Sequence, residues 1–485
     1  MTQWEAVIGL EVHARLLTKS KIFCGCSTEF GAPPNTNVCP VCLGYPGALP
    51  TLNAKAVQLA VRMAFATGCD IHLHSQFARK NYFYPDLPKG YQISQFDAPI
   101  ATNGTLTIRT SNGEKTVRIR RIHMEEDAGK LVHQTGPAQN SDHSSLVDLN
   151  RSGVPLIEIV TEPDLRTAEE ANVYLTRLRQ ILMYIDVCDG NMEEGSLRCD
   201  ANVSVHQQDA ELGTRAEVKN LNSFRFLGRA VDFEVARQIA VLERGERVVQ
   251  ETRLFDPVAG ETRAMRSKEE AHDYRYFPEP DLLPLRVERS FVEEIGRTLP
   301  MLPDDRIRRY ESQYGIARGD AETLIATREL ADYFEQTAEL SKNGKVAANW
   351  VKNEVLGLVN EHQIALDLFK VTPALLAGLI RMIDAAVIGR KVAKEVFEEM
   401  AESGEAPEAI VARKGLGQIV DPAVIREAAE RVLAGNPAQV AQYRAGKANV
   451  FGFLVGQLMK ETRGKASADL ANALLREILD AGSEG

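Results

Sequence analysis

Four of the seven cysteines in this chain lie close together in the sequence. Cys24 and Cys26 form one close pair, and Cys39 and Cys42 form a second pair after twelve intervening residues. Two such pairs on tight turns can bring four thiolates to the corners of a tetrahedron, the geometry that Zn²⁺ adopts in structural sites. Because four protein ligands leave no open position for water, the spacing favours a structural zinc over a catalytic one. The alternative is four reduced thiols without a metal.

Carboxylates are concentrated at a few other positions of the sequence. Glu11 and His13 are two residues apart in a strand-like segment, so both side chains are expected on one face of a sheet. Residues 125–127 are three consecutive acids, and Glu217 follows later in the chain. Like charges at this density need a bound cation or full solvation, and clustered carboxylates can hold Mg²⁺ that in turn holds phosphate oxygens. The alternatives are a solvated surface loop at 125–127 and an ordinary packed histidine at His13.

The common phosphate-binding patterns are missing from the sequence. No Gly-Lys pair precedes Ser or Thr at the Walker spacing, and no GxGxxG pattern opens a helix. Residues 79–92 instead combine three basic residues with four aromatic rings, and residues 273–281 form a second aromatic stretch. Such rings can stack on an adenine or on unpaired bases while the cations meet phosphate. The alternative for these tyrosines is a half-buried position in a strand.

The residue pattern changes near residue 295 and predicts an α+β fold. Before that point, short alternating segments at 7–16, 105–108, 117–119, 157–160 and 201–205 predict strands of an antiparallel sheet. Few helices are predicted there, and the best marked one is opened by Thr167 and Glu170 in a capping-box pattern. Afterwards only helical periodicity remains, including a helix capped by Thr372 and opened by Pro373. Glycines and a proline in 401–417 indicate a junction, so the predicted domains are 1–295, 296–405 and 406–485.

The net charge of −10 argues against a chain that coats nucleic acid without selectivity, because such binding needs a broad positive field. Any RNA contact must therefore use a local patch. Residues 440–476 provide one candidate, where six basic residues stand against two acids; a solvated helix face is the alternative. The N-terminal residues lack a basic segment followed by a long apolar stretch, which predicts a cytoplasmic protein with no membrane contact.

Several strings together resemble the B subunits of the aspartyl/glutamyl-tRNA amidotransferases, and the resemblance covers nearly the whole chain. It also favours the bacterial three-subunit form, because no large insertion of the archaeal E-subunit type interrupts the helical half. The strings that carry it are GLEVH (9–13), RKNYFYPDLPKGYQISQF (79–96), MEEDAGK (124–130), DLNRSGVPLIEIVTEPD (148–164), MEEGSLRCDANVSV (192–205), KNLNSF (219–224), DYRYFPEPD (273–281) and FGFLVGQLMK (451–460).

The resemblance implies a cradle-shaped, kinase-like catalytic domain with a zinc knuckle at 24–42, then a helical domain and a helical tail that binds tRNA. The implied reaction uses ATP to phosphorylate the side-chain carboxylate of Glu-tRNA(Gln) or Asp-tRNA(Asn), after which ammonia displaces phosphate. The implied catalytic residues and Mg²⁺ ligands are Glu11, Glu125, Glu126 and Glu217, with His13 and Asp200 as further Mg²⁺ ligands. Residues expected to bind the nucleotide or the tRNA 3′ end are Arg79, Lys80, Tyr82, Tyr84, Lys89, Tyr91 and Arg275. Residues expected to bind the tRNA body are Arg444, Lys447, Lys460, Arg463 and Lys465.

The sequence shows no glutaminase equipment, because it has no Gly/Ser-rich amidase signature and no evident Cys-His pair. By resemblance, an amidase A subunit supplies ammonia through a tunnel and a small C subunit wraps around both. The mischarging aminoacyl-tRNA synthetase is a further candidate partner. Two alternatives remain: a zinc-containing RNA-binding scaffold without chemistry, and an amidotransferase that uses only one of the two tRNAs.

Overall fold

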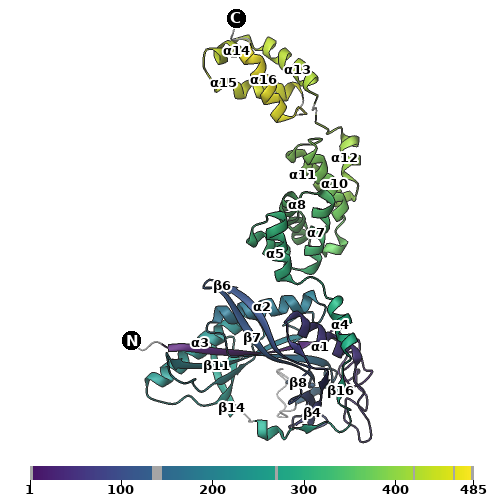
Figure 1. Cartoon of the computed structure of the whole chain (residues 1–485), viewed down its shortest axis with the longest axis vertical. Helices are drawn as coiled ribbons and strands as arrows, with labels where there is room; N and C mark the ends of the chain where they lie inside the picture. The colour runs from purple at the N-terminus through teal and green to yellow at the C-terminus, as the bar shows by residue number, and fades with distance from the viewer. Residues whose placement is uncertain (1–3, 134–144, 268–270, 419–420, 463–464, 482–485) are drawn as a thin grey trace, which may run out of the picture. The chain divides into compact units, whose positions relative to one another are not determined.

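The computed structural model describes the chain except residues 1–3, 134–144, 268–270, 419–420, 463–464 and 482–485 (Figure 1). The chain divides into two compact units, Met1–Pro303 and Asp304–Gly485. The boundary falls a few residues after the predicted position 295. This shift has a physical reason, since helix α4 (Arg289–Arg297) packs against helix α1 (Ala54–Ala66) of the first unit.

A twelve-stranded sheet forms the first unit. Neighbouring strands are antiparallel except β12 and β13, which are parallel and joined through helix α3 (Phe224–Glu243). The predicted antiparallel α+β fold is therefore confirmed, with one parallel pair. In sheet order the strands are β14 (Glu261–Ser267), β13 (Glu251–Asp256), β12 (Ala216–Lys219), β11 (Leu197–Gln207), β1 (Trp4–Arg15), β10 (Pro155–Thr161), β7 (Gly113–Glu126), β5 (Tyr91–Gln95), β4 (Phe77–Asn81) and β15 (Phe277–Pro278), with β6 (Ala101–Thr110) and β2 (Asp70–Ile71) attached beside β7.

Two short strand pairs and one 3-10 turn complete this unit. The pairs are β3 (His74–Ser75) with β16 (Leu285–Arg286) and β8 (Lys130–His133) with β9 (Ser145–Asp148), and the turn is η1 (Ala271–Tyr274).

Helices α1, α2 (Ala168–Tyr184) and α3 cover one face of the sheet (Figure 1). As predicted, Thr167 caps α2, because its hydroxyl accepts the backbone N–H of Glu170. The reciprocal half of the capping box differs, since the Glu170 carboxylate accepts the backbone N–H of Arg166 and pairs with Lys115. Those contacts tie the start of α2 to strand β7.

Alternation along the central strands gives the sheet one apolar and one polar face. Leu10, Val12, Ile157 and Ile159 are fully buried on the helix-covered face. Their neighbours in sequence, including Glu11 on β1, point to the opposite face, because successive side chains of a strand alternate. The fold thereby leaves an open polar face on which side chains of many strands can meet.

Strand β7 changes its facing direction part of the way along. Val117 and Ile119 are buried before residue 120, whereas Ile122 and Met124 are buried after it. The register with β10 shifts at this point, so that Arg120 has no partner there. A β-bulge of this kind re-aims the side chains that follow it. The odd-numbered residues after the bulge therefore face the polar side of the sheet.

The second unit consists of helices, as predicted. Thr372 caps α10 and Pro373 occupies its first turn, which confirms the predicted helix start. Helix α12 packs on α10 and α11, so it belongs with them, although it lies beyond the predicted boundary at 405. The helices are α5 (Pro303–Tyr314), α6 (Arg318–Leu324), α7 (Arg328–Ser341), α8 (Gly344–Trp350), η2 (Val351–Val355), α9 (Leu356–His362), η3 (Leu366–Leu368), α10 (Pro373–Asp384), α11 (Arg390–Ser403), α12 (Pro407–Lys414), α13 (Pro422–Gly435), α14 (Pro437–Arg444), α15 (Val450–Glu461) and α16 (Ala468–Ala481).

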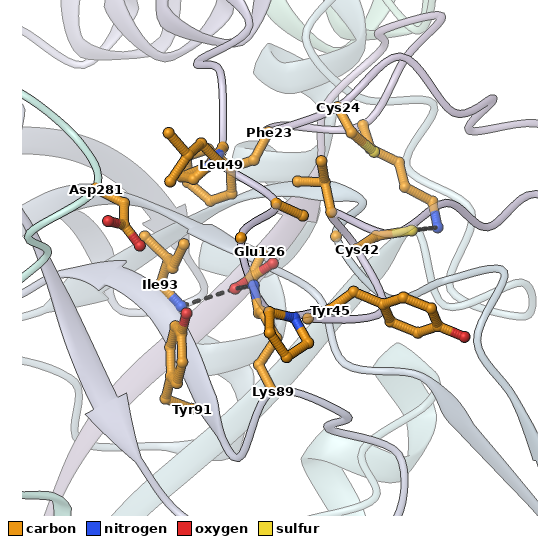
Figure 2. Close-up of a pocket in the computed structure, with 18 residues that line it drawn as sticks. Phe23, Cys24, Cys42, Tyr45, Leu49, Lys89, Tyr91, Ile93, Glu126 and Asp281 are labelled. Atoms are coloured by element: carbon orange, nitrogen blue, oxygen red, sulfur yellow. Dashed lines mark hydrogen bonds and ion pairs between the residues drawn. The ribbon is translucent and has the colours of Figure 1, made fainter.

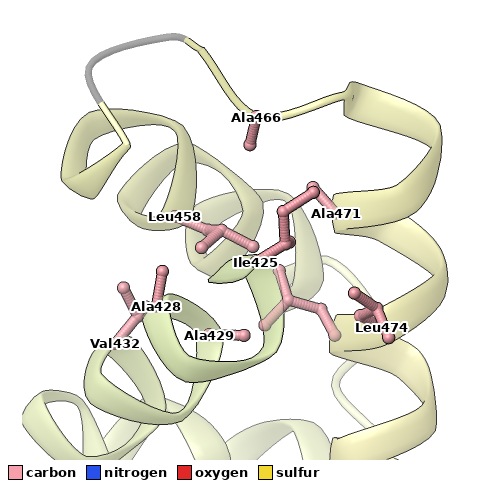
Figure 3. Packing of buried hydrophobic residues seen from close by; sticks show 9 residues of the cluster. Ile425, Ala428, Ala429, Val432, Leu458, Ala466, Ala471 and Leu474 are labelled. Carbon is pink, nitrogen blue, oxygen red and sulfur yellow. The ribbon is translucent and has the colours of Figure 1, made fainter. Parts of the chain in front are cut away.

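Helices α13, α15 and α16, three of the last four, share a small core of their own. Ile425 and Ala429 of α13, Leu458 of α15, and Ala471 and Leu475 of α16 are fully buried in it (Figure 3). This core is consistent with the predicted helical tail, and the three-domain division stays a prediction. Among the described helices, none combines the length and the apolarity that crossing a bilayer requires.

Candidate active site

The strand register brings acidic residues from distant parts of the sequence together on the polar face. Glu11 lies directly opposite Asp200, and Asn202 lies opposite Glu217 on the next strand. On the other side of β1, His13 lies opposite Glu158, which lies opposite His123. Directly paired residues share a face of the sheet, so these side chains form one continuous polar row.

Apart from Asn202, this row forms the floor of a cavity of about 690 Å³, a size typical of small-molecule sites. The cavity contains five of the six predicted Mg²⁺ ligands, Glu126 being the exception. Its lining residues are Glu11, His13, Lys80, Tyr82, Tyr84, Asp86, Ser94, Gln95, Phe96, Arg121, His123, Glu125, Ala128, Glu158, Asp200, Arg215, Glu217, Lys219, Gln250, Thr252, Tyr274 and Tyr276.

Four carboxylates of the cavity offer oxygen ligands to a cation. Glu125 is 4% exposed, which excludes the alternative of a solvated surface loop at this position. Asn202 Nδ2 donates to Glu11 Oε1 at 2.8 Å. Lys219 Nζ lies 2.5 Å from Asp200 Oδ2 and 3.0 Å from Glu217 Oε1, so a single cation faces two acids. Oxygen ligands of this kind suit Mg²⁺. Glu11 and Glu217 also make further contacts with other groups of the protein.

A histidine–glutamate–histidine row adjoins these carboxylates. His13 Nε2 lies 3.4 Å from Glu158 Oε2 and 3.6 Å from Glu125 Oε1, and His123 Nε2 lies 3.3 Å from the same Glu158 oxygen. Burial lowers the pKa of His13, but the hydrogen bond to Glu158 and the charges of Glu158 and Glu125 outweigh it and raise the pKa to about 9. Burial raises the pKa of Glu158, yet both histidines hold it well below its ordinary value. His13, Glu125 and Glu158 are close enough together to hold one metal ion.

Glu126 lies on the other side of β7 and does not join the group. Adjacent residues of a strand point in opposite directions, so Glu125 and Glu126 face different pockets. Glu126 pairs with Lys89 and accepts the backbone N–H of Ile93 at 2.8 Å (Figure 2). This second pocket has a volume of about 360 Å³. The position of Glu126 therefore does not support the predicted grouping with the Mg²⁺ ligands.

The predicted aromatic and basic segment divides between the two pockets in the same way. Lys80, Tyr82 and Tyr84 line the 690 Å³ cavity, whereas Lys89 and Tyr91 line the 360 Å³ pocket. Arg79 stacks on Tyr91 at 4.1 Å and forms a forked ion pair with Glu279 at 2.8 Å. Its guanidinium is thus already occupied by groups of the protein itself.

Arg275 is exposed and is not among the residues that line the cavity. Its neighbours Tyr274 and Tyr276 line the cavity instead. Lys80 lies over the Tyr274 ring at 4.7 Å, and Tyr276 stacks on Phe96 at 4.0 Å. The second aromatic stretch therefore contributes its tyrosines rather than the predicted arginine.

Glu158, His123 and Arg121 also line the cavity, and none of them is among the predicted site residues. Glu158 is the only charged residue of the otherwise apolar segment 154–160, which is the signal that could have indicated a function. His123 and Arg121 carried no such signal, because their direction depends on the bulge at Arg120.

The four cysteines of the predicted zinc knuckle do converge. Their sulfur atoms all lie within 4.8 Å of one another, and Cys42 Sγ lies 3.9 Å from Cys39 Sγ. Sulfurs of a tetrahedral zinc site with 2.3 Å bonds stand about 3.8 Å apart, so this donor set can hold a metal ion. The hydrogen bond from the Cys24 thiol lowers the pKa of Cys42 to about 4 even though burial opposes it, and the charge of Lys21 helps. The fully buried Lys21 ammonium lies 3.6 Å from Cys42 Sγ.

The predicted tRNA-binding cations of the tail lie on its surface. Arg444 ends α14, Lys460 lies on α15, and Lys447 and Lys465 lie in the adjoining loops, all of them exposed. Arg463 lies outside the described residues. Exposure is compatible with RNA contact but equally with solvation alone.

Comparisons with known proteins give one consistent result. Residues 6–293 match the family model described as the GatB/GatE catalytic domain, and residues 332–479 match the one described as the GatB domain. The B subunit of the aspartyl/glutamyl-tRNA(Asn/Gln) amidotransferase of Geotalea uraniireducens is 55% identical over 99% of this chain and 100% of its own length. Proteins of the same name from Anaeromyxobacter sp. strain K (56% identical, 99% of each chain) and Thermodesulfovibrio yellowstonii (52%, 98% of this chain and 99% of its own) agree. The chain therefore belongs to the family of aspartyl/glutamyl-tRNA(Asn/Gln) amidotransferase B subunits.

Proposed function

We propose that the 690 Å³ cavity activates the side-chain carboxylate of Glu-tRNA(Gln) and Asp-tRNA(Asn) at the expense of ATP. The γ-phosphoryl group passes to a carboxylate oxygen and ADP leaves; ammonia then attacks the acyl phosphate, and inorganic phosphate leaves as the amide forms. The observation that carries this proposal is the gathering of Glu11, Glu125, Asp200 and Glu217 on one floor. Phosphoryl transfer depends on positioning and on charge neutralisation, which such a set can provide together with metal ions.

Glu11, Glu125, Asp200 and Glu217 would hold Mg²⁺, which neutralises the phosphate charge when bound. His13 is better suited to orienting Glu125 than to binding Mg²⁺, because that ion prefers oxygen ligands and the ring lies between two carboxylates. The carboxylate of Glu126 faces the second pocket. Glu126 would therefore affect the reaction only indirectly, by holding the adjacent Glu125 in place.

Lys80, Tyr82 and Tyr84 are the predicted nucleotide-binding or tRNA-binding residues whose position fits the role best. Rings beside a cation can stack on the terminal adenosine or on the adenine of ATP. Arg79, Lys89, Tyr91 and Arg275 would act outside the cavity. We place the tRNA body on the cations of the tail, Arg444, Lys447, Lys460, Arg463 and Lys465.

The cysteine cluster would hold structural Zn²⁺ and stabilise the first unit. We propose an amidase A subunit as the source of ammonia, a small C subunit as the third component and the mischarging synthetase as a transient partner. A cytoplasmic location follows from these substrates.

Amidation by the reconstituted complex tests the proposal. Ammonium chloride replaces glutamine, so that the amidase step is bypassed, and both misacylated tRNAs are supplied. Amide formed with ATP, but not without it, is the expected result, and the two tRNAs show whether the specificity is dual. Tight tRNA binding without ADP or amide would contradict the proposal and would favour a scaffold.

A further inference from the structure

Arg121 is directed into the cavity by the bulge in β7. Without the shift at Arg120, the odd-numbered residues of this strand would remain on the helix-covered face, as Val117 and Ile119 do. The bulge instead places Arg121 two residues before His123 on the polar face, and both line the cavity. Bulges beside active sites commonly serve to re-aim one side chain in this way.

The guanidinium of Arg121 has unused hydrogen-bonding capacity. Its Nε is buried and has no hydrogen-bond partner among the described residues, none of which forms an ion pair with this arginine. The adjacent His123 is 3% exposed and its Nδ1 is also without a partner in the described part of the chain, while its Nε2 faces Glu158. Buried polar atoms without a partner are rare in folded proteins, so two neighbouring examples indicate that a ligand completes the site.

Three other lysines and arginines line the cavity, and Arg215 among them is exposed. Lys219 lies between Asp200 and Glu217, and Lys80 lies over an aromatic ring. Arg121 lies against the Phe96 ring at 6.0 Å, beside the stacked pair of Phe96 and Tyr276. An arginine beside an aromatic ring presents its fork of donors to an oxyanion, and weak competition from water strengthens that contact.

We propose that Arg121, supported by His123, is an oxyanion-binding residue that holds a reactant in the cavity. This proposal rests on the proposed function, because both reactants there carry oxyanions: the carboxylate to be activated and the γ-phosphate of ATP. A cavity floor of carboxylates repels either group. A dedicated cation at one end therefore gives the reactant a position that the acids alone cannot provide.

The test compares Arg121→Gln and Arg121→Lys with the control Arg120→Gln in the reconstituted complex. Arg120 is the adjacent residue, is exposed and lies outside the cavity, so the control makes the same chemical change without touching the site. Amidation is measured with ammonium chloride while ATP and Glu-tRNA(Gln) are varied in turn. Arg121→Gln is expected to raise the KM of one reactant roughly 10- to 100-fold, because a charge-assisted contact is lost. Arg121→Lys retains the charge, so its KM is expected to lie between that of Arg121→Gln and that of the Arg120→Gln control.

The reactant whose KM rises identifies the oxyanion. A rise for Glu-tRNA(Gln) assigns the substrate carboxylate, and a rise for ATP assigns the γ-phosphate. KM values within twofold of the wild type for both reactants, or a loss of kcat alone, would overturn the assignment. If Arg121→Gln fails to fold, the same criterion applies to Arg121→Lys. A wild-type complex that forms no amide would instead overturn the proposed function, so the two failures are distinguishable.

Discussion

The two pockets on either side of Glu125 and Glu126 differ in how their charges are satisfied. In the 360 Å³ pocket, Glu126 meets Lys89 and a backbone N–H, so the charges of the protein neutralise one another. In the 690 Å³ cavity, six carboxylates face four lysines and arginines, and no described carboxylate pairs with Arg121; the acids are Glu11, Asp86, Glu125, Glu158, Asp200 and Glu217, and the cations are Lys80, Arg121, Arg215 and Lys219. An unbalanced set of charges in a cavity therefore indicates that ligands bind there, whereas a balanced set indicates that the charges stabilise the fold.

The largest expected effect separates these adjacent glutamates. Glu125→Gln is expected to reduce ATP-dependent amidation by roughly 100-fold or more, because under the proposed function it removes a carboxylate that would hold Mg²⁺ at the reacting phosphate. Glu126→Gln leaves Lys89 as a buried cation without its partner, which typically costs about 3–5 kcal/mol of unfolding free energy. Turnover with ammonium chloride and thermal unfolding, measured on both variants, check this contrast. If both variants lost the same activity and unfolded at the same temperature, the two glutamates would not differ in role, which would contradict the prediction.

The cysteine cluster beside the 360 Å³ pocket is expected to affect stability first. Cys39→Ser should lower the unfolding temperature by roughly 5 °C or more. The substitution removes one of the four proposed metal ligands and leaves three thiols close together without the metal ion that would hold them. Metal content by mass spectrometry and calorimetry of the first unit's transition provide the measurement. Cys69→Ser, outside the cluster, is the matched control. A Cys39 variant that retains one zinc per chain and unfolds like the control would refute the assignment.

Sequence patterns were sufficient for five of the strands, for the starts of helices α2 and α10 and for the cysteine cluster, because each depends on local spacing. The side chains of Thr167 and Thr372 each cap the helix that follows directly. The apolar alternation of residues 7–16 likewise marks the strand in which it occurs. The carboxylates of the cavity were assigned to one site only through the family resemblance, since Glu11, Glu125 and Glu217 belong to strands far apart in the sequence. Only the register of the sheet brings them together.

What the sequence could not show depends on the direction of single side chains. Glu125 and Glu126 are equivalent as letters, yet one residue of alternation places them in different pockets. Arg79 and Lys80 divide for the same reason. The position of Arg121 also depends on an irregularity, since a bulge cannot be located from hydrophobic alternation in a strand whose charged residues continue on both sides of it.

The pH dependence of stability provides a smaller test of the cavity's charge imbalance. The pKa of His13 is raised from about 6.5 to about 9, so protonated His13 stabilises the fold fully below pH 6.5. This contribution is lost as the pH rises through 9. We expect the metal-free wild type to exceed His13→Gln by about 1–3 kcal/mol at pH 6 and by much less at pH 10. Denaturant unfolding with a chelator present provides the measurement, and a pH-independent difference would be inconsistent with it.

An exposed ion pair outside both pockets should have the smallest effect on the free energy of unfolding, and it serves as a reference for the buried charges. Arg118 and Asp164 lie 2.6 Å apart, but the arginine is 65% exposed, so solvent screens the pair. The hydrogen bonds and charge of Arg118 lower the pKa of Asp164 despite partial burial, so the stabilisation exists above the ordinary pKa and disappears as the pH falls through the lowered one. Arg118→Met is expected to lower the unfolding free energy least of all these variants at pH 7 and to leave it almost unchanged near pH 2. If this exposed pair matched the loss in Glu126→Gln, burial would not distinguish the charges of the two pockets, and the contrast between Glu125 and Glu126 would need another cause.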